Sequence, residues 1–219
     1  MNPLQKDLVK IIQENGLRYD TDSQYCLDII TYVALYTRLK DKPVVCYLPD
    51  SFDEYYDSCA SQARYEYRRA EKRGYVAQKA KPPHKEVIEI FKSKAKRQGR
   101  DINMVHHNIY GGTDKFTDKW VEEDYTKYTC PNHYVDFWVC GKDKTVAFAE
   151  ILHCGDYVIT RATMGHANCL KDGIMKYMFI NIIKDSIEKG RKYFNYGTKP
   201  FLEDERRHFV NQLGINQTK

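Results

Sequence analysis

The sequence lacks the patterns typical of secreted or membrane-inserted proteins. Its seven cysteines are an odd number scattered through apolar stretches, unlike the dense, even frameworks of small secreted domains. No apolar run reaches the length of a membrane-spanning helix. Residues 1–16 mix charged with apolar side chains, so the continuous apolar core of a signal peptide is missing. We therefore expect a cytoplasmic protein with reduced cysteines and no membrane partner.

The sequence also lacks the paired ligand spacing of a zinc site. His106 and His107 are adjacent and point in different directions, Cys130 and His133 have no second pair, and there is no Cys-x-x-Cys motif. No cysteine has the sequence context of a catalytic thiolate. The sequence thus predicts neither a metal centre nor a cysteine nucleophile.

The length and composition indicate one domain with a mild preference for anionic ligands. A chain of 219 residues with 42% hydrophobic content can bury one core but not two full ones. The net charge of +5 suits a pantetheine nucleotide or a nucleic acid. We divide this single domain, residues 1–219, into an N-terminal helical part (1–73), a basic segment with a variable loop (74–130) and a core (131–219).

The N-terminal part of the chain alternates helical and extended patterns. Apolar residues recur at helical spacing in two early segments, and a short β-type run between prolines follows them. Asp50 or Ser51 is placed to cap a long helix that ends before Gly74. The expected elements are helices at 4–12 and 26–39, a strand at 44–48, a helix reaching 73, a strand at 75–80, a helix at 86–96 and a loop at 101–117.

The C-terminal part of the chain predicts an antiparallel meander followed by a crossover. Strand-like runs alternate with glycine-containing turns at 134–140, 145–152 and 157–163. A polar loop, a largely buried helix at 173–189 that ends at Gly190, a strand at 192–196 and a helix at 200–213 follow. A strand, helix and strand in this order imply one parallel pair within an otherwise antiparallel sheet.

These closing segments resemble a known family. The run from Met175 to Gly197 (MKYMFINIIKDSIEKGRKYFNYG), followed by Arg207 to Gly214 (RHFVNQLG), is similar to the end of FemABX-like GNAT domains. In those domains a helix, a glycine, a strand ending in an aromatic residue and glycine, and a helix ending in glycine follow in this order. The segment RRAEKRGY, residues 68–75, resembles the part that precedes the family's acceptor-side loops. The resemblance implies an α/β (α+β) fold with a GNAT-like mixed sheet and N-terminal helices.

The resemblance also implies a transferase that moves an acyl or aminoacyl group from acyl-CoA or aminoacyl-tRNA onto an amine. The phosphate loop common in acetyl-CoA users is absent, and residues 164–173 take its place. Met164, Gly165 and Gly173 are the candidate donor-binding residues, because glycines at a helix N-terminus let backbone N–H groups approach an anion. Two turn glycines before a helix are the alternative interpretation. By the family pattern, a strand bulge near residues 162–165 would supply an oxyanion donor.

Two residues are candidates for proton transfer. Glu150 shares a strand face with Val146, Phe148 and Leu152, and such apolar neighbours would raise the pKa of a general base. The alternatives are that this face is exposed to solvent or that Glu150 pairs with Arg161. By analogy with GNAT enzymes, Tyr196 would be the general acid toward the leaving group. A tyrosine that simply packs at the end of a strand is the other interpretation.

Residues 64–100 contain thirteen lysines and arginines but only four acidic residues. This local excess of positive charge is larger than the net charge of +5 of the whole chain. Arginines among tyrosines can bind phosphates and stack on bases, whereas a solvated helix face is the alternative. Two arginines that flank a glycine turn would form an anion clamp if they converged. The candidate anion-binding and substrate-binding residues are Arg64, Arg68, Arg97, Arg100, His106 and His107.

Two classes of function therefore fit the sequence. The first is an acyltransferase or aminoacyltransferase, one variant of which modifies a nucleic acid base and resembles phage transferases of the Mom type. The second is a non-catalytic protein that binds nucleic acid through residues 64–100.

Overall fold

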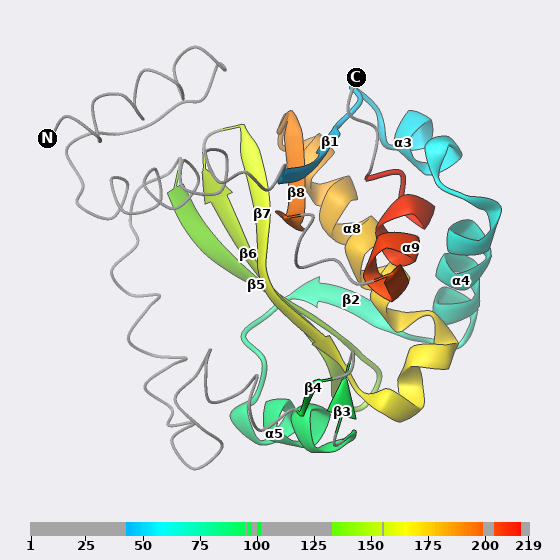
Figure 1. Cartoon of the computed structure of the whole chain (residues 1–219), viewed down its shortest axis with the longest axis vertical. Helices are drawn as coiled ribbons and strands as arrows, with labels where there is room; N and C mark the ends of the chain where they lie inside the picture. Colours follow the sequence, from blue (N-terminus) through cyan, green and yellow to red (C-terminus); the bar gives the residue numbers. More distant parts are fainter. Residues whose placement is uncertain are drawn as a thin grey trace, which may run out of the picture.

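The computed structural model describes residues 43–94, 96–97, 100–101, 133–154, 156–198 and 204–215. Six strands form one sheet in the order β1-β8-β7-β6-β5-β2, and β3 and β4 pair separately (Figure 1). The strands are β1 (Pro43–Tyr47), β2 (Val76–Lys79), β3 (Lys96–Arg97), β4 (Arg100–Asp101), β5 (His133–Gly141), β6 (Thr145–Cys154), β7 (Tyr157–Gly165) and β8 (Tyr193–Thr198). The helices are α3 (Phe52–Ser58), α4 (Ser61–Lys72), α5 (His84–Lys92), the 3₁₀ helix η2 (Ala167–Asp172), α8 (Ile174–Glu188) and α9 (Asp204–Gln212).

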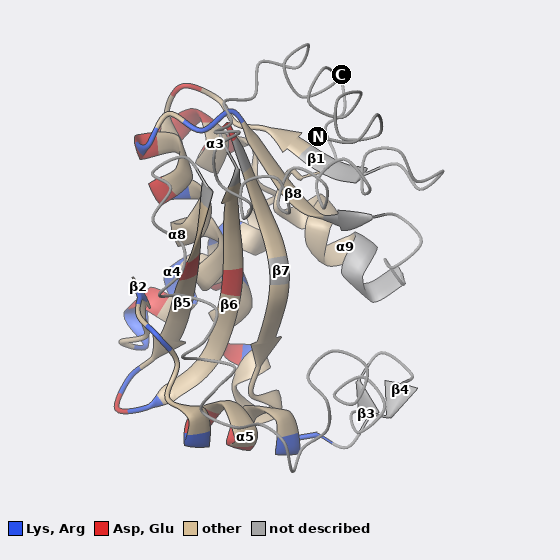
Figure 2. Cartoon of the chain, turned by 90° about the vertical axis from the view of Figure 1, so that its left-hand side faces the viewer, with Lys and Arg blue, Asp and Glu red and all other residues tan. Residues whose placement is uncertain are grey.

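The predicted meander and crossover are confirmed. Strands β5, β6 and β7 pair antiparallel and lie side by side in Figure 2. After them, α8 leads to β8, which pairs with β7 in parallel. Helix α8 is followed by Gly190, whose φ of 69° gives the left-handed conformation expected after a helix end. Among the described strands, β7 and β8 form the one parallel pair of a mixed sheet, which is the GNAT-like arrangement that the sequence predicted.

The two faces of the sheet are covered differently. Helix α8 packs on one face, where Ile180 and Ile183 join Ala147, Ala149 and Ile151 of β6 in the main core. On the other face, near one end of the sheet, α5 contacts Phe148 of β6 through its buried side chains, which are Val87, Ile90 and Phe91. The face beside α8 is called the inner face below, and the face beside α5 the outer face.

The prediction of one long helix that reaches residue 73 is wrong, because α3 and α4 are separate helices. Ser51 caps α3 by accepting a hydrogen bond from the backbone N–H of Glu54 at 3.2 Å, one of the two caps that the sequence suggested. The backbone is extended at Cys59, and the N–H of Ala60 donates to the carbonyl of Gln212 at 2.9 Å. The hydroxyl of Tyr55 donates to the carbonyl of Leu213 at 3.0 Å. These bonds to the end of α9 replace the helical bonds at the break.

Other differences are smaller, and some predictions fall outside the described residues. Helix α5 begins after Pro83 and ends at Lys92, four residues before the predicted end at 96. The predicted loop at 165–172 is largely the 3₁₀ helix η2. The expected helices at 4–12 and 26–39 and nearly all of the loop at 101–117 lie outside the described residues.

Candidate functional site

The parallel strands β7 and β8 are paired for only part of their length. The pairing joins Tyr157, Val158 and Ile159 to Tyr193, Phe194 and Asn195. Beyond that point β7 continues to Gly165 and β8 to Thr198 without further pairing between them. Beyond the parting, β7 and β8 no longer use each other's backbone N–H and C=O groups.

A β-bulge lies next to the point where β7 and β8 part. Glu150 of β6 is opposite Ala162 of β7, whereas the next residue, Ile151, is opposite Thr160. Arg161 is therefore the extra residue in β7, one position before the range in which the sequence analysis expected a bulge. A bulged residue leaves a backbone group outside the ladder and re-aims its neighbours.

Glu150 lies on the outer face, directly across from this bulge. Its side chain is only 3% exposed, and the register places it between Phe137 of β5 and Ala162 of β7. Phe148 and Leu152, two residues away on the same strand, are also buried. The face is thus covered at Glu150, which excludes the exposed-face alternative. The side chain of Arg161 lies outside the described residues, so pairing with it remains an alternative, and the role as a base stays a prediction.

Tyr196 lies on the inner face and not beside Glu150. Its ring packs against Phe179 of α8 at 5.1 Å and Phe209 of α9 at 5.7 Å between centroids. These contacts are those of a packing tyrosine. The structure therefore separates the two candidate catalytic residues by the thickness of the sheet, and acid catalysis by Tyr196 stays a prediction without geometric support.

The predicted donor loop is shaped largely by contacts within the chain. A Cβ added at Gly165 would lie 2.7 Å from Sδ of Met175, and one at Gly173 would lie 2.6 Å from the carbonyl oxygen of Glu66. Gly173 also has a φ of 85°, which favours glycine. Met164 packs against the α5 cluster on the outer face. Close packing against the backbone of α4 explains Gly173, whereas Gly165 faces the flexible side chain of Met175. Donor binding by these three residues stays a prediction.

A buried ion pair holds α4 against the start of α8. Nζ of Lys176 lies 2.8 Å from Oε1 of Glu66, and the two side chains are 8% and 17% exposed. Lys176 is in the first turn of α8, where the helix dipole disfavours a positive charge. Glu66 compensates that charge and fixes the helix start relative to α4.

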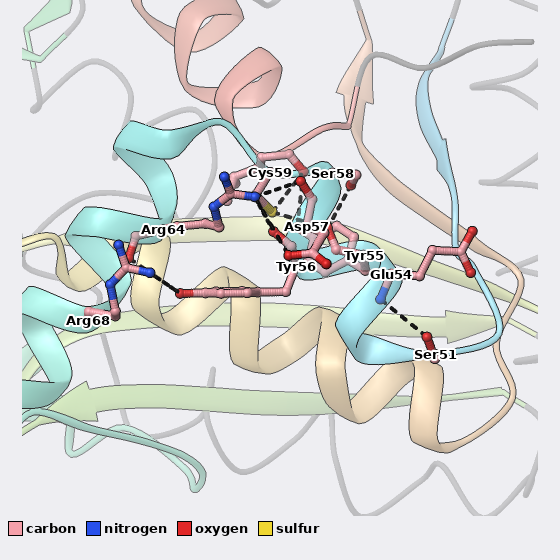
Figure 3. A network of polar contacts seen from close by, with 10 residues as sticks. Ser51, Glu54, Tyr55, Tyr56, Asp57, Ser58, Cys59, Arg64 and Arg68 are labelled. Carbon is pink, nitrogen blue, oxygen red and sulfur yellow. Dashed lines mark hydrogen bonds and ion pairs between the residues drawn. The ribbon is translucent and has the colours of Figure 1, made fainter.

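The candidate basic residues of α4 have partners within the fold (Figure 3). Arg64 donates to the carbonyl of Asp57 at the end of α3 at 2.7 Å, and Arg68 reaches the hydroxyl of Tyr56 at 3.5 Å. Two further arginines of the same segment, Arg69 and Arg73, bind the carbonyl of Lys171 and the carboxylate of Asp172. These arginines connect α4 to α3 and η2, and anion binding by Arg64 and Arg68 stays a prediction.

The remaining candidate anion-binding residues are described only in part. Arg97 and Arg100 are opposite one another in the β3–β4 pair, and nothing is described of their side chains. His106 and His107 lie outside the described residues. The predicted anion clamp thus stays a prediction.

Asn195 is a buried polar residue that the sequence analysis missed. It is 5% exposed and is paired with Ile159 of β7, which is paired with Leu152 of β6. Residues in register point to the same side of a sheet, so Asn195 shares the outer face with Glu150. Its neighbour Phe194 points to the inner face, where it contacts Phe179 of α8. The register of β8 against β7 and the contact of Phe194 with α8 together reveal this orientation.

A second polar cluster, which the sequence analysis also missed, lies on the inner face near the end of α8. His153 is 1% exposed, and its Nε2 lies 3.2 Å from Oδ2 of Asp136. The ring of Tyr134 stacks on His153 at 4.3 Å. Nζ of Lys79 lies 3.3 Å from Oδ2 of Asp136, and Nζ of Lys189 lies 3.8 Å from the same atom. The cluster joins β2, β5, β6 and α8.

Opposing effects set the protonation of this cluster. Burial lowers the pKa of His153 below its usual 6.5, and Asp136 offsets part of that shift. Burial acts to raise the pKa of Asp136, but His153 and the two nearby lysines outweigh it, so the pKa lies below its usual 3.8. His153 is therefore neutral and Asp136 ionised at neutral pH.

The described cysteines and helices limit other kinds of site. Burial raises the pKa of the Cys46 and Cys140 thiols to about 12, which keeps them protonated and unreactive. Within the described residues, no group of three or more His, Cys, Asp or Glu side chains is arranged to hold a metal ion. No helix in the described part of the chain is long and apolar enough to cross a bilayer.

No family model and no curated protein matches the sequence. Among solved structures, the chain resembles FemX with a TM-score of 0.54 at 11% identity, over 96% of this chain and 65% of that one. A conserved protein of unknown function from Bacteroides thetaiotaomicron gives 0.50 at 12% identity, over 97% and 72%. The C-terminal domain of a protein described as a lysylphosphatidylglycerol synthetase, from Agrobacterium fabrum, gives 0.46 at 15% identity, over 70% and 50%.

The chain therefore has a GNAT-like fold that it shares with FemX, as the sequence resemblance implied. It spans 65% of the length of FemX and half of the Agrobacterium chain.

Proposed function

We propose that the protein is a GNAT-fold transferase that moves an acyl or aminoacyl group onto an amine. One observation carries this proposal: the bulge of β7, the buried carboxylate of Glu150 and the parting of β7 from β8 coincide at one place in the sheet. The parting offers backbone groups to a carbonyl, and the carboxylate can accept a proton beside it.

The proposed step uses these groups as follows. The acceptor arrives as an ammonium ion and gives one proton to the carboxylate of Glu150. The resulting amine attacks the acyl carbonyl carbon, and a backbone N–H at the bulge stabilises the charge that develops on the carbonyl oxygen. The new C–N bond forms, the bond from the acyl carbon to the sulfur or oxygen of the donor breaks, and the leaving atom takes the second proton from nitrogen.

Two donors fit this chemistry, and both stand as parts of the proposal. The sequence resemblance to FemABX-like domains favours aminoacyl-tRNA, and the fold shared with FemX is consistent with that resemblance. The usual phosphate loop of acetyl-CoA users is replaced by η2. Met175 and Glu66 occupy the space beside the two glycines that flank η2. Acyl-CoA is therefore the second choice.

A donor screen tests the proposal. The purified protein is incubated with a mixture of isotope-labelled aminoacyl-tRNAs, or with a set of acyl-CoA thioesters, and with a panel of primary amines that includes peptides, lipid amines and adenine-containing oligonucleotides. Mass spectrometry then detects labelled amides. We expect an amide product from one donor class. Absence of any product, when each donor is intact at the end of the incubation, would contradict the proposal.

The non-catalytic nucleic-acid-binding alternative makes a different prediction. Arg64 and Arg68 contact α3, so their substitution would also disturb the fold, and Arg100 is the residue used for the test. Substituting Arg100→Ala should weaken oligonucleotide binding in a binding protein while Glu150→Gln leaves it unchanged. In a transferase, Glu150→Gln removes turnover. If a nucleic acid base is the acceptor, both substitutions reduce transfer to oligonucleotides, but only Glu150→Gln reduces transfer to other amines.

A further inference from the structure

We infer that the side-chain amide of Asn195 contacts the transferred acyl group and donates a hydrogen bond to its carbonyl oxygen. The inference rests on the proposed function and concerns the same place in the sheet. Asn195 is the last residue of β8 that pairs with β7, so it lies at the point where the two strands part.

The orientation of Asn195 supports this role. Among the described residues of the outer face, whose buried side chains are otherwise apolar, the buried polar ones are Glu150 and Asn195. Side chains alternate along a strand, and Phe194 contacts α8 on the inner face. Asn195 therefore projects toward the side that Glu150 occupies, whereas Tyr196 projects toward α8 and α9.

The spacing between Glu150 and Asn195 suits a small reacting group. β7 lies between β6 and β8, so two strand spacings separate Glu150 from Asn195 across the sheet. Along the strands, Asn195 is level with Leu152, which is two residues from Glu150. Strand geometry therefore places the two Cα atoms about 12 Å apart. In the proposed complex, an ester, thioester or amide lies between the two side chains, so that its carbonyl faces the N–H donor of Asn195 and the attacking nitrogen faces the carboxylate of Glu150.

In this inference Asn195, and not Tyr196, is the residue of β8 that contacts the reacting group. The amide N–H of an asparagine can stabilise a developing oxyanion together with a backbone N–H, and removal of one such donor typically lowers kcat about 100- to 1,000-fold. A residue that only packs would change stability without a matching loss of kcat in the folded fraction.

The test compares Asn195→Asp, which keeps the shape but removes the N–H donor, with Asn211→Asp on the exposed surface of α9. Thermal unfolding gives the folded fraction, and kcat is measured with the donor found in the screen. We expect a kcat loss of about 100-fold for Asn195→Asp, a much smaller change in KM for the donor, and no change for Asn211→Asp. Full kcat in folded Asn195→Asp would overturn the inference while leaving the transferase proposal intact.

A second measurement does not depend on turnover. Puromycin and acetonyl-coenzyme A keep the carbonyl of each donor class but cannot transfer it. The side-chain amide resonances of Asn195, assigned by their loss in Asn195→Asp, should shift when the matching probe binds. Binding without such a shift would refute the contact. Failure of the wild-type protein both to bind either probe and to transfer any acyl group would refute the proposed function and the inference together.

Discussion

Nε2 of His153 lies 3.2 Å from Oδ2 of Asp136 on the inner face of the sheet, at a site where the imidazole is almost fully buried. Because burial lowers the pKa of His153 below 6.5, the unfolded chain takes up a proton more readily than the folded one does. The contribution of His153 to the free energy of unfolding is therefore fully present above about pH 6.5 and is lost as the pH falls below that value.

We predict that the free energy of unfolding decreases between pH 7.5 and pH 5.5, by at most about 1.4 kcal/mol per pH unit for one proton. Urea unfolding at each pH measures this change. In His153→Gln the decrease should be smaller, whereas His208→Gln, at an exposed position of α9, should behave as the wild type does. An equal pH dependence in wild type and His153→Gln would contradict the assignment. Asp136, whose pKa is lowered, contributes a second loss of stability only at pH values near and below its usual 3.8.

Gly173 and Gly190 form a matched pair for testing the packing of the donor loop. Both have left-handed backbones, with φ of 85° and 69°. A methyl group at Gly190 meets nothing within 4 Å, whereas one at Gly173 would lie 2.6 Å from the carbonyl oxygen of Glu66. We predict that Gly190→Ala costs about 1 kcal/mol from backbone strain alone, and that Gly173→Ala costs distinctly more. If urea unfolding gave equal losses of unfolding free energy for the two variants, the close contact between α4 and Gly173 would be contradicted.

The ion pair between Lys176 and Glu66 should contribute more than an exposed pair of the same length. Both this pair and the one between Lys144 and Glu89 have a separation of 2.8 Å. The Lys144 and Glu89 side chains are 56% and 42% exposed, against 8% and 17% for Lys176 and Glu66. Removing one partner of a buried pair strands the other charge and costs about 3 kcal/mol.

We therefore predict a loss of that order for Glu66→Gln, substantial recovery in the double variant Glu66→Gln with Lys176→Met, and no resolved change for Glu89→Gln. Chemical denaturation of the four proteins, wild type included, measures these differences. A double variant as unstable as Glu66→Gln alone would mean that the stranded charge of Lys176 is not the cause of the loss.

The sequence predicted the parts of the fold that local chemistry decides. Turn residues around Gly141 and Asp156 separate the strands of the meander, and Gly190 ends α8. The break between α3 and α4 was missed, because Cys59 and Ala60 leave the helix only to meet residues 212 and 213, which lie far away in the sequence.

The candidate site was predicted less completely for a related reason. The alternation along β6 placed Glu150 on the face of Phe148, and the structure agrees. The family pattern drew attention to Tyr196, yet which residue of β8 faces Glu150 depends on its register against β7. A shift of one residue exchanges Asn195 and Tyr196 between the faces, and the sequence of β8 alone does not fix that register.

The most direct test of the central claim is the turnover number of Glu150→Gln in the transfer reaction, measured beside Glu188→Gln, which alters an exposed carboxylate at the end of α8. Both variants should show wild-type unfolding curves at neutral pH before their rates are compared. We predict that Glu150→Gln lowers kcat about 100- to 10,000-fold, the usual contribution of a general base, and that Glu188→Gln retains the wild-type value. Wild-type turnover by folded Glu150→Gln would contradict the proposal that this buried carboxylate takes the proton from the attacking amine.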